Sequence, residues 1–252
     1  MKDLIISAST KYTKSELFLY VDSINKCGFN GDKIMVVYDV TKETIDWLKE
    51  NGWDVYQSNL VGHIHMNRLI TIYSILRQLN IQYRYVITTD VRDVVFQKNP
   101  SEYLEKNLTK DILVSSENVL YKDEPWGVKN ILEGYNELLL DRYKDDVTCN
   151  VGVLAGKYES MLDLLLLNYL VSQSGNTIHF TDQSSFNFII HNNLVKNNIQ
   201  LEGLETNWAL QIGTLTNPKL IGKLSYNLED YFILHQYDRN PQIKEFIYKK
   251  YL

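Results

Sequence analysis

The stretch Tyr85-Val-Ile-Thr-Thr-Asp-Val-Arg-Asp-Val-Val-Phe-Gln97 places two carboxylates directly after an apolar, strand-like run. An ionised carboxylate is costly to remove from water unless a compensating charge lies beside it. Asp90 and Asp93 at a strand end therefore indicate a bound cation. Mg²⁺ and Mn²⁺ prefer carboxylate and phosphate oxygens, so we interpret the stretch as a site for a metal-bound nucleotide diphosphate. An exposed turn, in which Arg92 pairs with a neighbouring acid, is the alternative.

The first hundred residues alternate between strand-like and helix-like segments. Apolar runs predict strands over 4–8, 34–38, 53–56 and 85–89, and residues at helical spacing predict helices between them. Such alternation is typical of a parallel sheet, whose ligands bind beyond the carboxyl ends of the strands. We therefore expect an α/β fold with a central, mostly parallel sheet and helices on both faces.

The alternation loosens after about residue 100. The pattern predicts strands over 111–116, 150–156 and 231–234, a loop over 117–129, and helices over 158–171, from residue 181 onward and at the C-terminus. A glycine inside the 150–156 strand indicates close approach of a ligand or neighbour. No linker, internal repeat or low-complexity tract divides the sequence. We expect one domain over 1–252, with halves 1–100 and 101–252.

Composition excludes several classes of protein. A net charge of −5 over 252 residues argues against a nucleic-acid binder, which would carry a basic stripe. Cys27 and Cys149 are far apart, as expected in a reducing compartment, and residues 1–7 lack the apolar core of a signal peptide. We therefore expect a cytoplasmic location. The tail at 244–250 mixes basic and aromatic residues, so peripheral membrane contact is an alternative to a simple closing helix.

Common catalytic motifs do not occur in the sequence. It contains neither the G-x-x-x-x-G-K-[ST] loop nor the G-x-G-x-x-G fingerprint. His63 and His65 have no third ligand at zinc-motif spacing, so we interpret them as ordinary polar residues. Trp126 and Trp208 are candidates either for stacking on sugar rings or for packing in the core.

The order of segments resembles the GT-A glycosyltransferases, in particular the glycogenin and bacterial galactosyltransferase-like group. The resemblance covers most of the chain in order. Besides the acidic motif, it rests on Ser7-Ala-Ser-Thr10, Asn67-Arg68, Cys149-Asn-Val-Gly-Val153, Thr181-Asp-Gln183 with Asn187, and Ile233-Leu-His235. It implies a GT-A fold, with a nucleotide-binding half over 1–100 and an acceptor-side half over 101–252.

The resemblance also implies roles for individual residues. Asp93 and His235 would bind the metal together with Asp90, although the spacing here is D-x-x-D rather than the family's D-x-D. Asp182 and Gln183 would be catalytic. Nucleotide-sugar contacts are implied for Ser7, Ala8, Ser9, Thr10, Asp39, Arg68, Asp90, Asn150 and Arg239.

The expected activity is transfer of a sugar from a nucleotide diphosphate, with UDP-sugar the favoured donor and Mn²⁺ or Mg²⁺ as cofactor. Glycan, lipid-linked and protein acceptors all remain open, and the resemblance favours a retaining over an inverting reaction. One alternative is a sugar nucleotidyltransferase, but its phosphate loop normally contains glycine and residues 7–11 contain none. Another is a non-catalytic carbohydrate-binding protein on a transferase fold.

Overall fold

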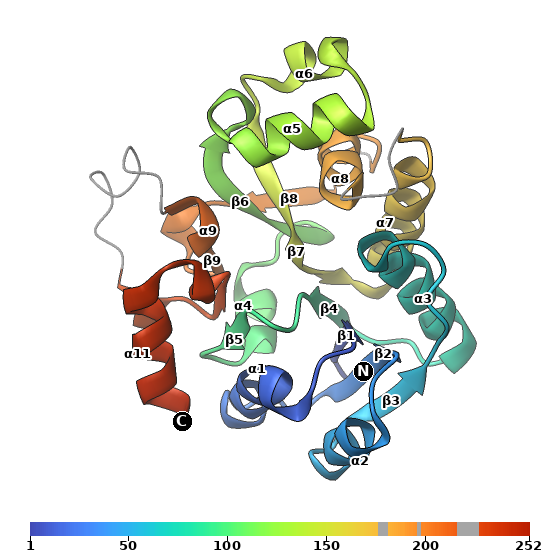
Figure 1. The fold of residues 1–252 in the computed structure, drawn as a ribbon, viewed down its shortest axis with the longest axis vertical. Coiled ribbons are helices and arrows are strands. Elements are labelled where there is room, and N and C mark those ends of the chain that lie inside the picture. The colour runs from blue at the N-terminus through green and yellow to red at the C-terminus, as the bar shows by residue number, and fades with distance from the viewer. Residues whose placement is uncertain (176–180, 196–197, 216–226) are drawn as a thin grey trace.

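The structure, a computed structural model, describes residues 1–175, 181–195, 198–215 and 227–252. A seven-stranded sheet runs through the molecule, with helices on both of its faces (Figure 1). Its strands are β1 (Leu4–Thr10), β2 (Asp32–Tyr38), β3 (Asp54–Gln57), β4 (Tyr85–Thr89), β6 (Ile112–Leu120), β7 (Val147–Lys157) and β8 (Ile199–Glu202). The helices are α1 (Lys14–Lys26), α2 (Lys42–Glu50), α3 (Ile64–Leu79), α4 (Pro100–Asn107), α5 (Pro125–Gly134), α6 (Glu137–Tyr143), α7 (Tyr158–Ser172), α8 (Thr181–His191), α9 (Ile212–Leu215) and α11 (Pro241–Tyr251).

The strand order in this sheet is β3-β2-β1-β4-β7-β6-β8, and only β7 runs against its neighbours. β1 pairs in parallel with β2 and β4, and β6 pairs in parallel with β8. The antiparallel pairing of β4 with β7 places Thr89 opposite Val153. The N-terminal half of β7 therefore lies beside the carboxyl end of β4, where Asp90 follows.

Alternating side chains of β1 enter two hydrophobic cores, one on each face of the sheet. Leu4 and Ile6 pack with residues of α3, α7 and α8, whereas Ile5 packs with residues of α1, α2 and α4. The period of two in a strand accounts for this division. Helices on both faces of a mostly parallel sheet confirm the predicted fold class.

A second, three-stranded sheet has the order β5-β10-β9, with β5 at Val94–Phe96, β9 at Ala209–Gln211 and β10 at Ile233–His235. β10 is antiparallel to β5 and parallel to β9. The register sets His235 opposite Val94 on one side and Gln211 on the other. This small sheet therefore brings the chain after the acidic motif together with a segment near the C-terminus.

Residues 117–129 were predicted to be a loop, and that prediction is wrong. β6 continues to Leu120, a 3₁₀ turn covers Tyr121–Asp123, and α5 begins at Pro125. The side chain of Glu124 accepts hydrogen bonds from the backbone N–H groups of Trp126 and Gly127 and so caps the helix. A capping side chain followed by proline at the first helical position is a common start signal, which also opens α4 and α11.

The C-terminal helix α11 buries one face and exposes the other. Ile243, Ile247 and Tyr251 pack in a hydrophobic cluster with residues of the small sheet, while Lys249 and Lys250 are exposed. Within the described ranges, no helix has both the length and the apolar character that crossing a membrane would take.

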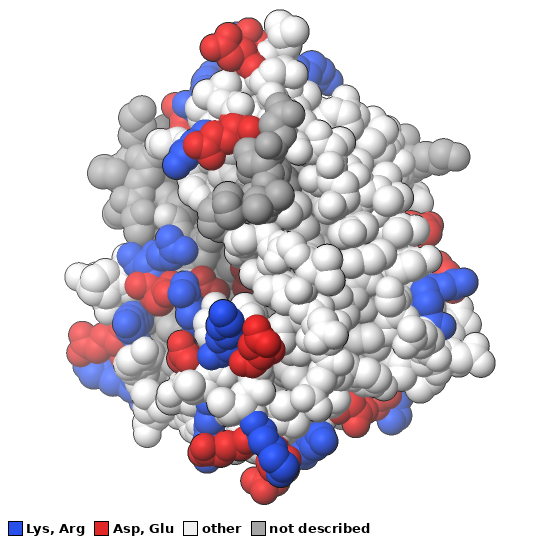
Figure 2. Space-filling model, turned by 45° about the vertical axis from the view of Figure 1, so that its right-hand side comes forward, with Lys and Arg blue, Asp and Glu red and all other residues white. Residues whose placement is uncertain are grey.

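Charged residues are mixed on the side of the molecule that carries α3 and α7. Figure 2 shows Lys and Arg there in small groups beside Asp and Glu, with a broad uncharged area between them. The described part of this face therefore carries no stripe of a single sign.

We predict that Trp208→Ala lowers the free energy of unfolding by about 3–5 kcal/mol, because it removes a buried aromatic side chain and leaves a cavity. Trp208 is fully buried and its ring lies 5.0 Å from that of Tyr103. Urea denaturation measures the loss. Trp126→Ala is the matched control, since Trp126 is 43% exposed and its removal should change stability by less than about 1 kcal/mol. Equal losses in the two variants would contradict the assignment of Trp208 to the core.

Candidate active site

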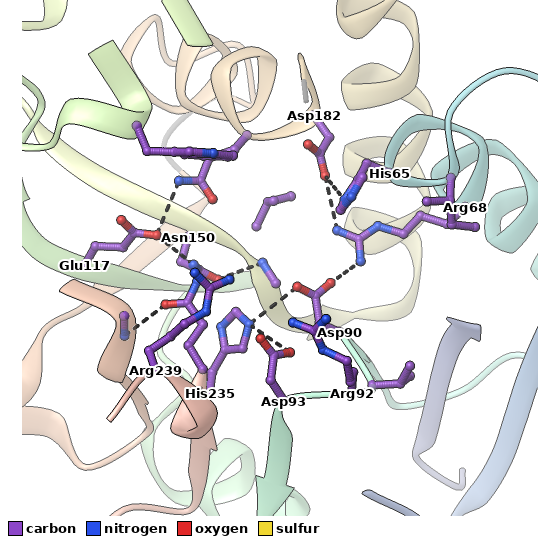
Figure 3. A pocket seen from close by; sticks show the side chains of 18 of the residues that line it. His65, Arg68, Asp90, Arg92, Asp93, Glu117, Asn150, Asp182, His235 and Arg239 are labelled. Carbon is purple, nitrogen blue, oxygen red and sulfur yellow. Dashed lines mark hydrogen bonds and ion pairs between the residues drawn. The ribbon is translucent and has the colours of Figure 1, made fainter. Parts of the chain in front are cut away.

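A cavity of about 550 Å³ lies at the carboxyl ends of β1 and β4, beside the N-terminal half of β7 (Figure 3). Its lining contains five acids and three arginines together with aromatic and amide side chains. The charged lining residues are Arg68, Asp90, Arg92, Asp93, Glu117, Glu124, Asp182 and Arg239. A cavity at this edge of an α/β sheet is where such folds usually bind ligands.

Asp90, Asp93 and His235 form a group suited to a metal ion. One ligand atom from each residue lies within 4.8 Å of the others. Asp90 follows β4, Asp93 precedes β5, and His235 ends β10, so the two sheets together assemble the group. Among the described residues, no other group of three or more acids, cysteines and histidines meets this spacing.

The surroundings of His235 fix which ring nitrogen faces the acids. Its Nδ1 lies 2.6 Å from Gln211 Oε1, and because an amide oxygen only accepts, Nδ1–H is the donor. In the neutral ring Nε2 is then an acceptor, and it points between Asp90 Oδ2 at 3.4 Å and Asp93 Oδ1 at 3.8 Å. Nε2 is buried without a hydrogen-bond partner in the described part of the chain. A buried lone pair facing two carboxylates is a donor set that fits a divalent cation.

Electrostatics at this group also favour an added positive charge. Burial raises the pKa of Asp93, and the neighbouring Asp90 carboxylate raises it further. Burial alone would lower the pKa of His235, but the nearby carboxylates outweigh it and raise that pKa. Without a metal ion, a proton on His235 is the charge that best compensates the acids.

Gly152 on β7 allows the group to close. Its carbonyl oxygen accepts a hydrogen bond from the Asp90 N–H at 2.8 Å. A Cβ atom at this position would collide with the His235 ring and lie 2.8 Å from Asp90 Oδ2. The glycine inside the predicted strand thus marks a close approach between strand and site, as expected.

Arg68 on α3 connects the metal group to Asp182 on α8. Its guanidinium donates to Asp90 Oδ1 through Nη1 and to Asp182 Oδ2 through Nη2, the latter at 3.2 Å. Burial alone would lower the pKa of Arg68, but the two carboxylates raise it, so the side chain stays cationic. His65 Nδ1 lies 3.7 Å from the same oxygen of Asp182.

Glu117 is a further buried acid in the cavity, which the sequence analysis missed. Its Oε1 accepts hydrogen bonds from Asn150 Nδ2 at 2.7 Å and from Gln183 Nε2 at 3.3 Å. Burial raises the pKa of Glu117 to about 7 in spite of these bonds. In the sequence, Glu117 directly follows Ser115-Ser116 at the end of an apolar run, much as Asp90 follows the run that ends at Thr89. This pattern could have identified Glu117 as a candidate.

The four residues predicted to cradle the nucleotide split between the two faces of β1. Ala8 and Thr10 line the cavity, whereas Ser7 is buried on the other face and hydrogen-bonded to Tyr20 at 2.8 Å. Ser9 is also buried and is not part of the lining. The strand pleat, which turns successive side chains to opposite faces, is the physical reason.

The other predicted residues are also divided by their positions. Asn150, Asp182, Gln183, Arg239 and Arg68 line the cavity together with the metal group. Asp39 is exposed in a left-handed conformation after β2 and is not a lining residue. Of the two tryptophans, Trp126 lines the cavity, and Trp208 packs in the core.

Comparisons with known proteins identify the fold. No family model matches the sequence, and no curated protein matches it. Two crystal structures of the glycosyltransferase GlyE from Streptococcus pneumoniae TIGR4, one of them the apo form, match 93% of this chain with 17% identity and TM-scores of 0.54 and 0.55. A structure of an active-site mutant of LgtC matches 92% of this chain with 12% identity and a TM-score of 0.57.

The match covers 86% of the LgtC chain but 54% of the GlyE chains, so this sequence spans about half the length of GlyE. At such low identity the similarity concerns the fold. The chain has the GT-A fold of these glycosyltransferases.

We predict that Mn²⁺ raises the melting temperature of the wild-type protein and that Asp93→Ala abolishes the rise. If the metal binds the native state and not the unfolded chain, the melting temperature should rise on the order of 5 °C when the metal is at about 100 times its Kd. Thermal unfolding over a Mn²⁺ titration measures it. Asp163→Asn, an exposed acid on α7, is the control that removes one negative charge outside the cavity. A wild-type response in Asp93→Ala would refute the metal assignment.

We also predict that Glu117→Gln changes how stability depends on pH. The pKa of Glu117 is 4.5 in the unfolded chain and about 7 in the native state. Between these two pH values Glu117 keeps a proton in the native state that the unfolded chain releases. Its contribution to stability is therefore lost as pH rises through this window. From pH 5 to pH 8 the free energy of unfolding of Glu117→Gln should rise by roughly 2–3 kcal/mol relative to that of the wild type. Urea denaturation at each pH measures this difference. Glu43→Gln, an exposed acid on α2, is the control. Parallel pH profiles for wild type and Glu117→Gln would contradict the perturbed pKa.

Proposed function

We propose that this protein is a metal-dependent glycosyltransferase that moves a sugar from a nucleotide diphosphate, with UDP-sugar as the expected donor, to an acceptor hydroxyl. The observation that carries the proposal is the Asp90–Asp93–His235 group, which shares one cavity with the Arg68–Asp182 ion pair. The GT-A fold supports it, since the compared structures are of glycosyltransferases. A cytoplasmic location stays a prediction from the sequence.

Asp90, Asp93 and the Nε2 atom of His235 would hold Mg²⁺ or Mn²⁺. When bound, the cation would neutralise negative charge on the diphosphate leaving group. Gln211 would keep the His235 ring in the required tautomer through its hydrogen bond to Nδ1.

The nucleotide would bind on the β1 side of the cavity. Ala8, Thr10 and Tyr12 line that side, and Thr10 Oγ1 is buried there without a hydrogen-bond partner among the described residues. Arg92 and Arg239 line the cavity near the metal group and can interact with phosphate oxygens. Asp39 lies at a neighbouring strand end outside the lining, and its contact with the nucleotide sugar stays a prediction from the sequence.

Asp182 and Gln183 would act at the transferred sugar. Transfer passes through an oxocarbenium-like state, which a nearby carboxylate stabilises. Arg68 Nη2 lies 3.2 Å from Asp182 Oδ2 and occupies that oxygen, which favours charge stabilisation and a retaining reaction over proton abstraction in an inverting one. The LgtC structure carries a glutamine-to-glutamate substitution described as an active-site mutation, and Gln183 lies in the cavity here.

The alternative of a sugar nucleotidyltransferase has less support. The connection from β1 to α1 is Lys11-Tyr-Thr13, and it contains no glycine to bring backbone N–H groups close to phosphates. Turnover of a donor would distinguish a transferase from the alternative, a non-catalytic carbohydrate-binding protein.

We predict that Asp182→Asn reduces donor turnover at least about 100-fold and changes donor affinity less than about threefold. The substitution keeps the shape of the side chain and removes its charge, which matters most in the transition state. Hydrolysis of UDP-sugars with Mn²⁺ gives turnover, calorimetric titration with UDP gives affinity, and proton NMR of the released sugar gives the anomeric outcome.

Asp163→Asn is again the matched control and should leave both quantities unchanged. Binding of UDP by a wild-type protein that neither hydrolyses nor transfers any donor would favour the non-catalytic alternative. Turnover by Asp182→Asn at the wild-type rate would remove Asp182 from catalysis.

A further inference from the structure

One wall of the cavity is acidic and carries an exposed indole. Glu117, Glu124, Trp126, Asp182 and Gln183 line it, from the end of β6, the start of α5 and the start of α8. In Figure 3, Glu117 and Asp182 lie above Arg92, Asp93 and Arg239. The cavity therefore has different chemistry on two sides, with the metal group and two arginines on one side, and Glu117, Glu124 and the Arg68-paired Asp182 on the other.

Trp126 differs from the other three tryptophans of the chain in its exposure. It is 43% exposed, whereas Trp47, Trp53 and Trp208 are 9%, 2% and 0% exposed. A single exposed apolar side chain is ordinary on a protein surface. An exposed indole inside a polar cavity is different, because flat aromatic surface beside acceptors for hydroxyl groups makes a binding site for a ligand with both characters.

The backbone around Trp126 is held in a fixed position. Its N–H donates to Glu124 Oε1 at 3.1 Å, and its carbonyl accepts from Asn130 Nδ2 at 2.8 Å. Pro125 occupies the first turn of α5. Gly127 leaves room for the Glu124 carboxylate, since a Cβ there would lie 2.8 Å from Oε2. The indole thus projects from a capped helix rather than from a loop. A fixed backbone lowers the entropy cost of binding a ligand to the indole.

The charges on this wall restrict the ligand. Three arginines, Arg68, Arg92 and Arg239, are among the described lining residues, and no lysine is. Arg68 already serves Asp90 and Asp182, and Arg92 and Arg239 lie on the side of the metal group, where Asp238 is within 3.6 Å of both. A carboxylate or phosphate bound next to Trp126 would lie beside Glu124 and the Arg68-paired Asp182, with no further arginine or lysine among the described lining residues on that side, and like charges repel.

We infer that Trp126 is the platform of the acceptor subsite and that the acceptor presents an uncharged sugar, whose apolar face stacks on the indole while its hydroxyls donate to Glu117, Glu124 or Asp182. The identification of this subsite as the acceptor site rests on the proposed function. The sugar-binding site itself rests on the cavity, the exposed indole and the charges, and it can be tested without turnover.

Trp126 serves as the reporter in the test. Because the other tryptophans are buried, acrylamide quenching of the intrinsic fluorescence reports mainly on Trp126. We would measure quenching of the full chain with UDP and Mn²⁺ present, while titrating methyl glycosides of glucose and galactose and, separately, methyl glucuronide. The neutral glycosides should reduce the quenching constant at least about twofold, and the glucuronide should leave it unchanged.

Variants test the same site through activity. Trp126→Ala should raise the KM for a neutral acceptor glycoside about tenfold, a larger factor than its effect on donor hydrolysis. Leu132→Ala is the matched control, because Leu132 is on the same helix, is 41% exposed and is not a lining residue. It should leave both quantities unchanged.

Each outcome decides one point. Equal protection by the glucuronide would overturn the uncharged acceptor, and no protection by any glycoside would overturn the subsite. Loss of donor hydrolysis in Trp126→Ala would move Trp126 to the donor side and so refute the inference. Protection by neutral glycosides in a protein without any turnover would leave the sugar site standing and refute the transferase proposal instead.

Discussion

The guanidinium of Arg68 holds together three parts of the chain that the sequence separates widely. It projects from α3, pairs with Asp90 at the end of β4, and reaches Asp182 at the start of α8. Breaking a buried pair on one side leaves an uncompensated charge, which costs several kcal/mol. The positions of the metal group and of the acid at the other side of the cavity are thus linked through one cation. Loss of Arg68 would disturb both, so its effect could not be assigned to one function.

Several features of this arrangement are readable from the sequence, each for a definite physical reason. The strand at Tyr85–Thr89 is found with its correct bounds because it is a short apolar run closed by acids. Asp90 and Asp93 follow from that run, since strand ends in α/β folds face the ligand. His235 and Asp182 depend instead on the resemblance in segment order, because a lone histidine or a helix-start acid has no local signature of binding. The structure brings all four to one cavity.

Other features depend on tertiary packing and escape the sequence. Glu117 lies in the segment interpreted as a loop, and its raised pKa exists only because β6 runs on and buries it. The resemblance groups four consecutive residues as one cradle, namely Ser7, Ala8, Ser9 and Thr10. The pleat of β1 turns successive side chains to opposite faces, so only Ala8 and Thr10 line the cavity. The hydrogen bond from His235 to Gln211 depends on the pairing of β10 with β9, and a pairing between short, distant strands leaves no trace in either segment.

The pairing of β5 with β10 also has a consequence for the order in which the protein matures. Asp93 and His235 lie about 140 residues apart in the chain yet meet across one short antiparallel ladder. At a synthesis rate of about 5–20 residues per second, the two aspartates leave the ribosome roughly 7–30 seconds before the histidine does. During that interval the group of Asp90, Asp93 and His235 lacks its imidazole. Binding of the proposed metal by all three residues would therefore require the final strand to be made and docked, which couples the completed site to the pairing of the small sheet.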